Sequence, residues 1–90
     1  MLEDKIKVCN SLGLHVRAAA QLVRLASSFK SKIKLHRTDN HVIADAKSIL
    51  SVLTLAASKG AELKIEVQGK DESEAMQAIE EIFRKGFGEI

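Results

Sequence analysis

The stretch Glu62-Leu63-Lys64-Ile65-Glu66-Val67-Gln68 alternates polar and apolar residues without a break. Successive side chains of a β-strand point to opposite faces of a sheet, so its three apolar residues are expected to share one face. The opposite face carries charged and amide groups that suit water. The pattern therefore predicts a sheet that packs against helices through one face only.

The residues after this strand are expected to form a covering helix. It opens at Asp71, and Glu74 three residues later gives the acidic version of a capping box. Arg84, Lys85 and then Gly86 are typical of a helix C-terminus. Apolar residues recur at helical intervals along the segment, at Ala75, Ile79, Ile82 and Phe83.

Two further helices are predicted before this strand. Residues 16–29 carry one apolar stripe, and residues 47–58 carry a second before Gly60, a residue that favours a helix end. The first stripe comprises Ala19, Val23, Ala26 and Phe29, with Leu22 and Leu25 beside it. The second comprises Ile49, Leu50, Leu53 and Ala57.

Alternation predicts three more strands, the first of which places Ile6 and Val8 on one face before Asn10. Residues 32–36 and 41–46 are expected to pair as a hairpin. The order βαββαβα predicts a single domain over residues 1–90 with an α/β (α+β) fold. We expect an open-faced two-layer sandwich, in which three helices cover one face of a four-stranded antiparallel sheet.

Composition narrows the function classes. The chain has 90 residues, a net charge of +2 and no Trp or Tyr, so neither a strong positive charge nor an aromatic platform favours nucleic-acid binding. Cys9 is the only cysteine, and the charged start MLEDKIKV does not resemble a secretory signal. We therefore expect a cytoplasmic protein without membrane insertion. His36 and His41 form no recognised metal spacing with His15, so we expect neither metal nor cofactor.

The segment Gly13-Leu14-His15-Val16-Arg17 places a histidine and an arginine at the start of the first predicted helix. The first N–H groups of a helix lack internal partners and favour an anion there. A neutral imidazole is a nucleophile near pH 7, and a guanidinium forms strong bonds to phosphate oxygens. These residues fit a phosphorylated histidine supported by Arg17. The alternative is structural, with His15 as a local cap and Arg17 as a solvated side chain.

The same segment resembles the active-site signature of the HPr family, the histidine-containing phosphocarrier proteins of the phosphoenolpyruvate-dependent phosphotransferase system. Two further stretches resemble the family in the right order, Lys47-Ser48-Ile49-Leu50 and Ala57-Ser58-Lys59-Gly60-Ala61-Glu62. The resemblance therefore covers the whole chain. It implies the same open-faced sandwich that the periodicity predicts.

The resemblance also implies a function. In the family, the histidine matching His15 accepts a phosphoryl group from phosphoenolpyruvate-charged enzyme I and passes it to enzyme II A-type proteins, while the arginine matching Arg17 supports the phosphate. The chain would be a stoichiometric phosphocarrier in bacterial sugar transport rather than an enzyme. We expect a monomer, because rapid exchange between partners suits small, transient contacts.

The resemblance further implies that an HPr serine kinase phosphorylates Ser48. Ile49, Leu50 and Leu53 match apolar positions through which family members contact partners. The chain departs from the family pattern at Ala18, where proline is common. We expect the first helix to form despite this change.

Two alternatives to a sugar-uptake carrier remain open. Residues 85–89 and 58–60 resemble the nitrogen-related paralogue, which uses the same histidine chemistry for regulation. The second alternative is a regulatory protein-binding module that is switched by Ser48 rather than by His15. The presence of His15 favours a carrier, because a module of that kind has no need for the histidine.

Overall fold

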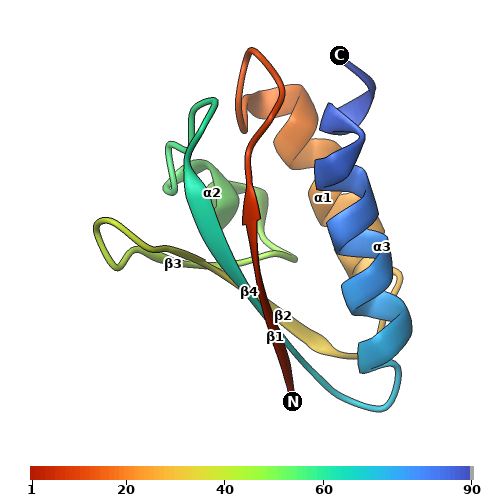
Figure 1. Cartoon of the computed structure of the whole chain (residues 1–90). Coiled ribbons are helices and arrows are strands. Elements are labelled where there is room, and N and C mark those ends of the chain that lie inside the picture. The colour runs from red at the N-terminus through yellow and green to blue at the C-terminus, as the bar shows by residue number, and fades with distance from the viewer. Residues whose placement is uncertain (90) are drawn as a thin grey trace.

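The computed structural model describes residues 1–89, whose elements follow the predicted order βαββαβα and end in a short 3-10 turn, η1. Three helices lie on one side of the sheet and leave its other face open (Figure 1). The elements are β1 (Leu2–Lys7), α1 (Val16–Ser27), β2 (Lys32–Arg37), β3 (Ile43–Asp45), α2 (Ile49–Leu53), β4 (Glu62–Gln68), α3 (Glu72–Arg84) and η1 (Gly86–Gly88).

The sheet has the strand order β1-β4-β2-β3, and every neighbouring pair is antiparallel. The alternating strand β4 therefore lies inside the sheet and pairs on both sides, with Ile65 opposite both Asp4 of β1 and Leu35 of β2. Leu63, Ile65 and Val67 are fully buried, which confirms the face assigned from their spacing.

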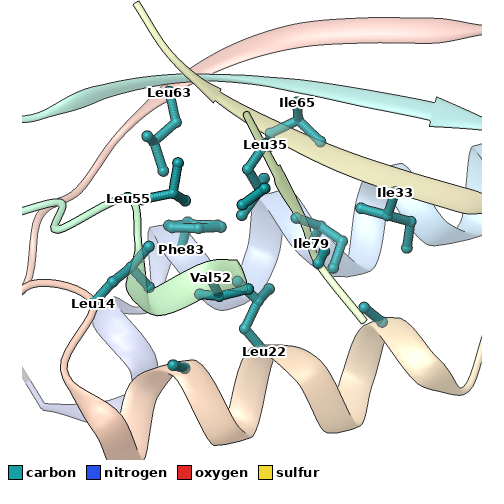
Figure 2. Packing of buried hydrophobic residues seen from close by; sticks show 14 of the residues in the cluster. Leu14, Leu22, Ile33, Leu35, Val52, Leu55, Leu63, Ile65, Ile79 and Phe83 are labelled. Carbon is teal, nitrogen blue, oxygen red and sulfur yellow. The ribbon is translucent and has the colours of Figure 1, made fainter. Parts of the chain in front are cut away.

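The core fills the space between the sheet and the helices. In Figure 2, Leu22 of α1 and Val52 of α2 point toward each other, and Phe83 of α3 lies beneath the sheet. The largest fully buried apolar side chains come from all three helices, the two inner strands β2 and β4, and the loops: Phe83, Leu22, Ile33, Leu35, Leu55, Leu63, Ile65, Ile79, Val8, Val52 and Val67. Each helix thus contributes to one continuous core.

Helix α1 begins at Val16, as expected, although Ala18 replaces the family's proline. Its buried face differs from the predicted stripe, because Ala18, Ala19, Leu22 and Ala26 are buried while Val23 is only partly buried. The small side chains at 18 and 19 allow close packing on the core. Leu22 then supplies the apolar volume that the sequence pattern assigned to Val23.

Helix α2 is much shorter than predicted, because it ends at Leu53 instead of near Ser58. Ala56 adopts a left-handed conformation with φ of 48°, which a helix does not continue through. Leu55 and Ala57, on either side of it, are buried. Burial of these two side chains turns the chain toward β4 before the expected stop at Gly60.

The predicted capping box at the start of α3 is wrong. Asp71 is the N-cap residue, but its side chain makes no capping bond. Its carboxylate instead accepts hydrogen bonds from the backbone N–H groups of Lys30 (2.8 Å) and Ser31 (2.9 Å), and from the Ser31 hydroxyl (2.5 Å). These bonds, led by the Ser31 hydroxyl, lower the pKa of Asp71 to about 2. Asp71 therefore ties the start of α3 to the segment after α1.

No helix within residues 1–89 combines the length and the apolar character that crossing a membrane requires.

Candidate functional site

His15 lies where the loop after β1 enters α1. It is the N-cap residue, with extended backbone angles (φ −74°, ψ 176°), and its side chain is 25% exposed. Two neighbours fix the approach of this loop. Gly13 has a φ of +64°, and a Cβ atom there would lie 2.4 Å from the Ala57 carbonyl oxygen. The buried Leu14 donates its backbone N–H to the same oxygen at 2.9 Å.

The N-terminus of α1 is open to an anion on the side of His15. No side-chain hydrogen bond from the described residues caps this helix, and no acidic residue lies in its first turn. The first N–H groups of a helix point outward, and the helix dipole adds roughly half a positive charge there. A negatively charged group attached to the His15 ring would meet this favourable electrostatic environment.

Arg17 stands in the first turn of α1 with 70% of its side chain exposed. Its Nη2 atom lies 3.9 Å from the Glu89 Oε2 atom, and the same oxygen contacts the His15 Nε2 atom. Glu89 follows η1 and is only 10% exposed at its side chain. The structure therefore brings His15 and Arg17 together around a carboxylate that sequence reasoning did not assign to the site.

The side-chain amide of Asn10 donates a hydrogen bond to this carboxylate. The residue is fully buried, and its Nδ2 group donates to Glu89 Oε1 at 3.0 Å and to the Gly13 carbonyl oxygen at 2.8 Å. The amide of Asn10 and then the imidazole of His15 lower the pKa of the Glu89 carboxyl below its ordinary value. Glu89 is therefore ionised at neutral pH. The sequence analysis also missed Asn10, which there only marked the end of the first strand.

Phe87 anchors the chain segment that carries Glu89. Its ring is buried and meets the Phe83 ring edge-on, with centroids 5.1 Å apart and an interplanar angle of 74°. The Phe87 backbone is left-handed, with a φ of 55°, and the glycines on both sides also have positive φ. A left-handed conformation is unfavourable for a bulky residue, so burial of the ring must offset its cost.

Ser48 is the N-cap residue of α2, and its hydroxyl oxygen accepts the Ser51 backbone N–H at 3.4 Å. Ile49 is 37% exposed and Leu50 is 75% exposed, whereas Leu53 is partly buried against the core. Of the three predicted apolar contact residues, Leu50 is thus the most accessible. Helix α2 packs against α1, the helix that begins at the histidine.

Two exposed apolar residues flank the histidine and were not singled out in the sequence. Leu12 is 66% exposed in the loop before His15, and Val16 is 63% exposed directly after it. A leucine and a valine that face water on both sides of a reactive group are suited to a partner surface. The signal available in the sequence was their position beside the motif, since neither fits a core stripe.

The other two histidines lie away from this site. His36 lies against the carboxylate of Glu66 on the open face of the sheet, and His41 is exposed in the hairpin. The His36 side chain is 19% exposed. Among residues 1–89, no group of three or more His, Cys, Asp or Glu side chains is arranged to hold a metal ion.

Comparisons with known proteins agree with this arrangement. A family model described as "PTS HPr component phosphorylation site" matches residues 2–85. The phosphocarrier protein HPr of Xylella fastidiosa (strain Temecula1) is 45% identical over 89 residues, which cover 99% of this chain and 98% of the relative. Both alignments include the whole segment from Gly13 to Arg17.

Solved structures give the same result for the fold. The crystal structure of HPr-C-His from Thermoanaerobacter tengcongensis has a TM-score of 0.92 and 37% identity, and the match covers 100% of this chain and 99% of that chain. Crh, a Bacillus subtilis catabolite repression protein described as an intertwined, swapped dimer, has a TM-score of 0.73 and 32% identity, with 96% of this chain and 97% of that chain covered. Since the family model, a full-length relative and the antiparallel sandwich all lead to one family, this chain belongs to the HPr family of phosphocarrier proteins of the phosphotransferase system.

Proposed function

We propose that His15 accepts a phosphoryl group from enzyme I charged by phosphoenolpyruvate, and passes it to enzyme II A-type proteins. The observation that carries this proposal is a partly exposed imidazole at the uncapped start of α1. The chain itself ends each cycle unchanged. It therefore acts as a stoichiometric carrier in the cytoplasm rather than as a catalyst, and neither a metal nor a cofactor takes part.

The transferring group is stabilised by charge and by position. As the phosphoryl group reaches the His15 ring, its oxygens approach the free N–H groups that begin α1, and Arg17 supplies a cation beside them. Phosphoryl transfer depends mostly on positioning and on electrostatic stabilisation of the equatorial oxygens. The exposed guanidinium of Arg17 is free to follow the group from donor to acceptor.

Docking uses the apolar residues around the histidine. Leu12 and Val16 flank His15, while Ile49 and Leu50 face outward on the adjacent helix α2, and Leu53 supports that helix from its partly buried position. Exposed apolar side chains beside a small polar site are suited to brief contacts with several partner proteins. The carrier works as a monomer in these exchanges and binds no nucleic acid.

Ser48 is a regulatory position for an HPr serine kinase. A phosphate there adds roughly 1.5 to 2 negative charges at a helix N-terminus, which α2 itself tolerates. The added charge lies next to the exposed Ile49 and Leu50. Phosphorylation therefore weakens docking of enzyme I without unfolding the carrier.

The retained histidine favours a carrier over a regulatory module that is switched only by Ser48. His15 is partly exposed and lies beside Arg17 and an open helix end, all of which a purely protein-binding module would not need. The nitrogen-related paralogue remains the second candidate, because the segment Lys85–Glu89 resembles it and reaches the same histidine. Both candidates share the chemistry at His15 and differ in the acceptor protein.

The test is to incubate the purified chain with enzyme I and phosphoenolpyruvate and to measure the added mass. We expect one phosphate per chain, which is lost in mild acid, as phosphohistidine is. His15→Ala should abolish this labelling, whereas His41→Asn, at an exposed histidine away from the site, should leave it unchanged. A wild-type chain that stays unmodified would contradict the proposal.

A further inference from the structure

The guanidinium of Arg37 connects the hairpin after β2 to the segment that follows α2. Arg37 is the last residue of β2, and its side chain is 18% exposed. Its Nη1 group donates hydrogen bonds to the carbonyl oxygens of Leu55 and Ala56, both at 3.0 Å. Its Nε and Nη2 groups donate to the two carboxylate oxygens of Asp39, both at 2.8 Å. One side chain therefore joins two parts of the chain that are separate in sequence.

Asp39 fixes the orientation of this guanidinium. Two parallel hydrogen bonds between an arginine and a carboxylate hold the planar group in one position. They use Nε and Nη2, which leaves Nη1 directed at the carbonyl oxygens of Leu55 and Ala56. The hydrogen bonds from Arg37 also lower the pKa of the Asp39 carboxyl below its ordinary value, so the carboxylate is ionised at neutral pH.

The two carbonyl groups lie where the chain leaves α2. Thr54 is the C-cap residue of this helix, and Ala56 has the left-handed φ of 48° that turns the chain away. Carbonyl groups at a helix end lack the partners that a further turn would supply, and a basic side chain can bond them. Arg37 therefore stabilises this turn, in addition to the burial of Leu55.

The same turn supports the loop that leads to His15. Ala57 follows the two bonded carbonyl groups, and its own carbonyl oxygen accepts the backbone N–H of Leu14 at 2.9 Å. The backbone of Gly13 packs so closely here that a Cβ atom would lie 2.4 Å from the same oxygen. Leu14 directly precedes His15, the N-cap residue of α1. A shift of Ala57 is therefore expected to shift the histidine.

We propose that Arg37 is a positioning residue for phosphoryl transfer, which holds the carbonyl groups of Leu55 and Ala56 so that the next residue supports the loop presenting His15. The inference rests on the proposed function of His15. It adds to that function a side chain that acts through the backbone of residues 55–57. Because a misplacement of about 1 Å can cost about 10²-fold in rate, support of this kind affects the reaction from a distance.

The competing explanation is that Arg37 only stabilises the fold. Its removal would then act through lost stability, and an equally destabilising change elsewhere would have the same effect on the reaction. Asp71→Asn provides that comparison. Asp71 bonds Lys30 and Ser31 after the end of α1, whereas His15 lies at the start of that helix.

The experiment compares the wild-type chain with Arg37→Ala, Arg37→Lys and Asp71→Asn. Initial rates of labelling by enzyme I and phosphoenolpyruvate, at varied carrier concentration, give kcat and KM, and thermal melting gives the Tm. Hydrogen exchange followed by NMR compares the amide of Leu14 with the amide of Ile65 in the inner strand β4. The Ile65 amide reports global opening, so faster exchange at Leu14 alone reports loosening of the loop.

We expect Arg37→Ala to lower kcat about tenfold, with KM within about twofold of wild type. The Leu14 amide should exchange about tenfold faster relative to the Ile65 amide. Arg37→Lys should restore part of both properties, because an ammonium group can still donate to the two carbonyl oxygens. Asp71→Asn should lower the Tm but keep the wild-type kcat and the wild-type ratio of the two exchange rates.

Three results would contradict the assignment of Arg37. The first is a wild-type kcat in Arg37→Ala, and the second is an equal loss of kcat in Asp71→Asn at a similar Tm. The third is a lower kcat without faster exchange of Leu14 relative to Ile65. If Arg37→Ala does not fold, Arg37→Lys takes its place, and wild-type values of both properties would contradict the assignment.

Failure of the proposed function gives a different result. A wild-type chain that is not labelled would contradict the role of His15. The exchange of the Leu14 amide requires no phosphoryl transfer, so it still tests whether Arg37 supports the loop.

Discussion

The side chains of His15 and Arg17 differ in their exposure to solvent and in their contacts with neighbouring residues. The His15 side chain is 25% exposed and contacts a carboxylate, whereas the Arg17 side chain is 70% exposed and only approaches the same carboxylate at 3.9 Å. The proposed nucleophile is thus in contact with a neighbouring side chain, whereas the guanidinium beside it lies mostly in solvent. This difference suits the roles proposed for the two residues, in which the ring presents one atom to the phosphoryl group and the guanidinium accompanies that group between proteins.

Replacement of Arg17 by alanine should slow phosphorylation by enzyme I about tenfold and leave the fold intact. The reason is that removal of one preorganised charge from a transition state costs about 10²–10³ in a closed site, and solvent reduces this effect at an exposed side chain. The rate is measured by labelling with phosphoenolpyruvate. Arg24→Ala, an exposed arginine in the last turn of the same helix, is the control and should react normally. A normal rate for Arg17→Ala would remove its assigned role.

At Ser48, the effect of an added negative charge can be tested separately from the effect of losing the helix N-cap. Aspartate and asparagine both act as good N-cap residues, so Ser48→Asp and Ser48→Asn should each preserve α2. Only the aspartate adds negative charge beside Leu50. We expect Ser48→Asp to raise the KM of enzyme I for the carrier several-fold, and Ser48→Asn to leave it near wild type. Equal KM values for the two variants would argue against regulation by charge.

At the scale of elements, α1 and α3 are joined through a carboxylate instead of a conventional cap. Asp71 at the start of α3 accepts three hydrogen bonds from Lys30 and Ser31, which follow α1. The folded pKa of about 2 lies below the ordinary value of 3.8. Stability from this group is therefore fully present above about pH 4 and is lost as pH falls through 2.

Asp71→Asn should lower the Tm by several degrees at pH 7, because an amide oxygen cannot replace a carboxylate that accepts three bonds. The difference from wild type should shrink as pH falls from 4 to 2, where the wild-type carboxyl takes up its proton. Thermal melts followed by circular dichroism at these pH values measure both effects. Asp45→Asn is the control, because its amide oxygen still accepts from the Lys47 N–H. A Tm difference that stays constant with pH would contradict this account.

For the whole molecule, the buried core and the proposed docking surface lie on opposite sides of the helical layer. Leu22 of α1 is fully buried, whereas Leu50 of α2 is 75% exposed. The same substitution at these two leucines therefore separates the core from the docking surface. Because a small domain has only about 5–15 kcal/mol of stability, loss of one core leucine should be readily measured.

Leu22→Ala should lower the free energy of unfolding by about 2–5 kcal/mol, since a cavity replaces a buried side chain. Leu50→Ala should change it by less than about 0.5 kcal/mol, as is usual for exposed residues, but should raise the KM for phosphorylation. Urea denaturation and labelling by enzyme I measure the two properties. A stable Leu50→Ala variant with normal KM would exclude Leu50 from the docking surface.

Regular patterns were sufficient to predict the layers of this fold. The alternation in β4 predicted its bounds, Glu62–Gln68, and the buried face that the structure confirms. The end of α2 was not predictable in the same way. Ala56 takes a left-handed conformation because its neighbours are buried, and alanine itself favours a helix. At Ala56, tertiary packing therefore outweighs the helix propensity of the residue.

The site was predicted only in part for a related reason. His15 and Arg17 form a local motif at a helix start, so their proximity follows from spacing. Glu89 contacts His15 across 74 positions of sequence. The available signal was Gly86-Phe87-Gly88, an apolar residue between two glycines that suggests a tight turn. Nothing in that pattern indicated the direction of the turn, which depends on Asn10 and Phe83.

The turn between β4 and α3 lies at the opposite end of the molecule from the loop that leads into α1 (Figure 1). Lys70 is exposed in that turn. A tether attached at Lys70, for example to a sensor chip or to a fused protein, would leave every approach to the imidazole free. Lys70 is therefore a suitable attachment point for immobilising the protein while its exchange of phosphoryl groups is measured.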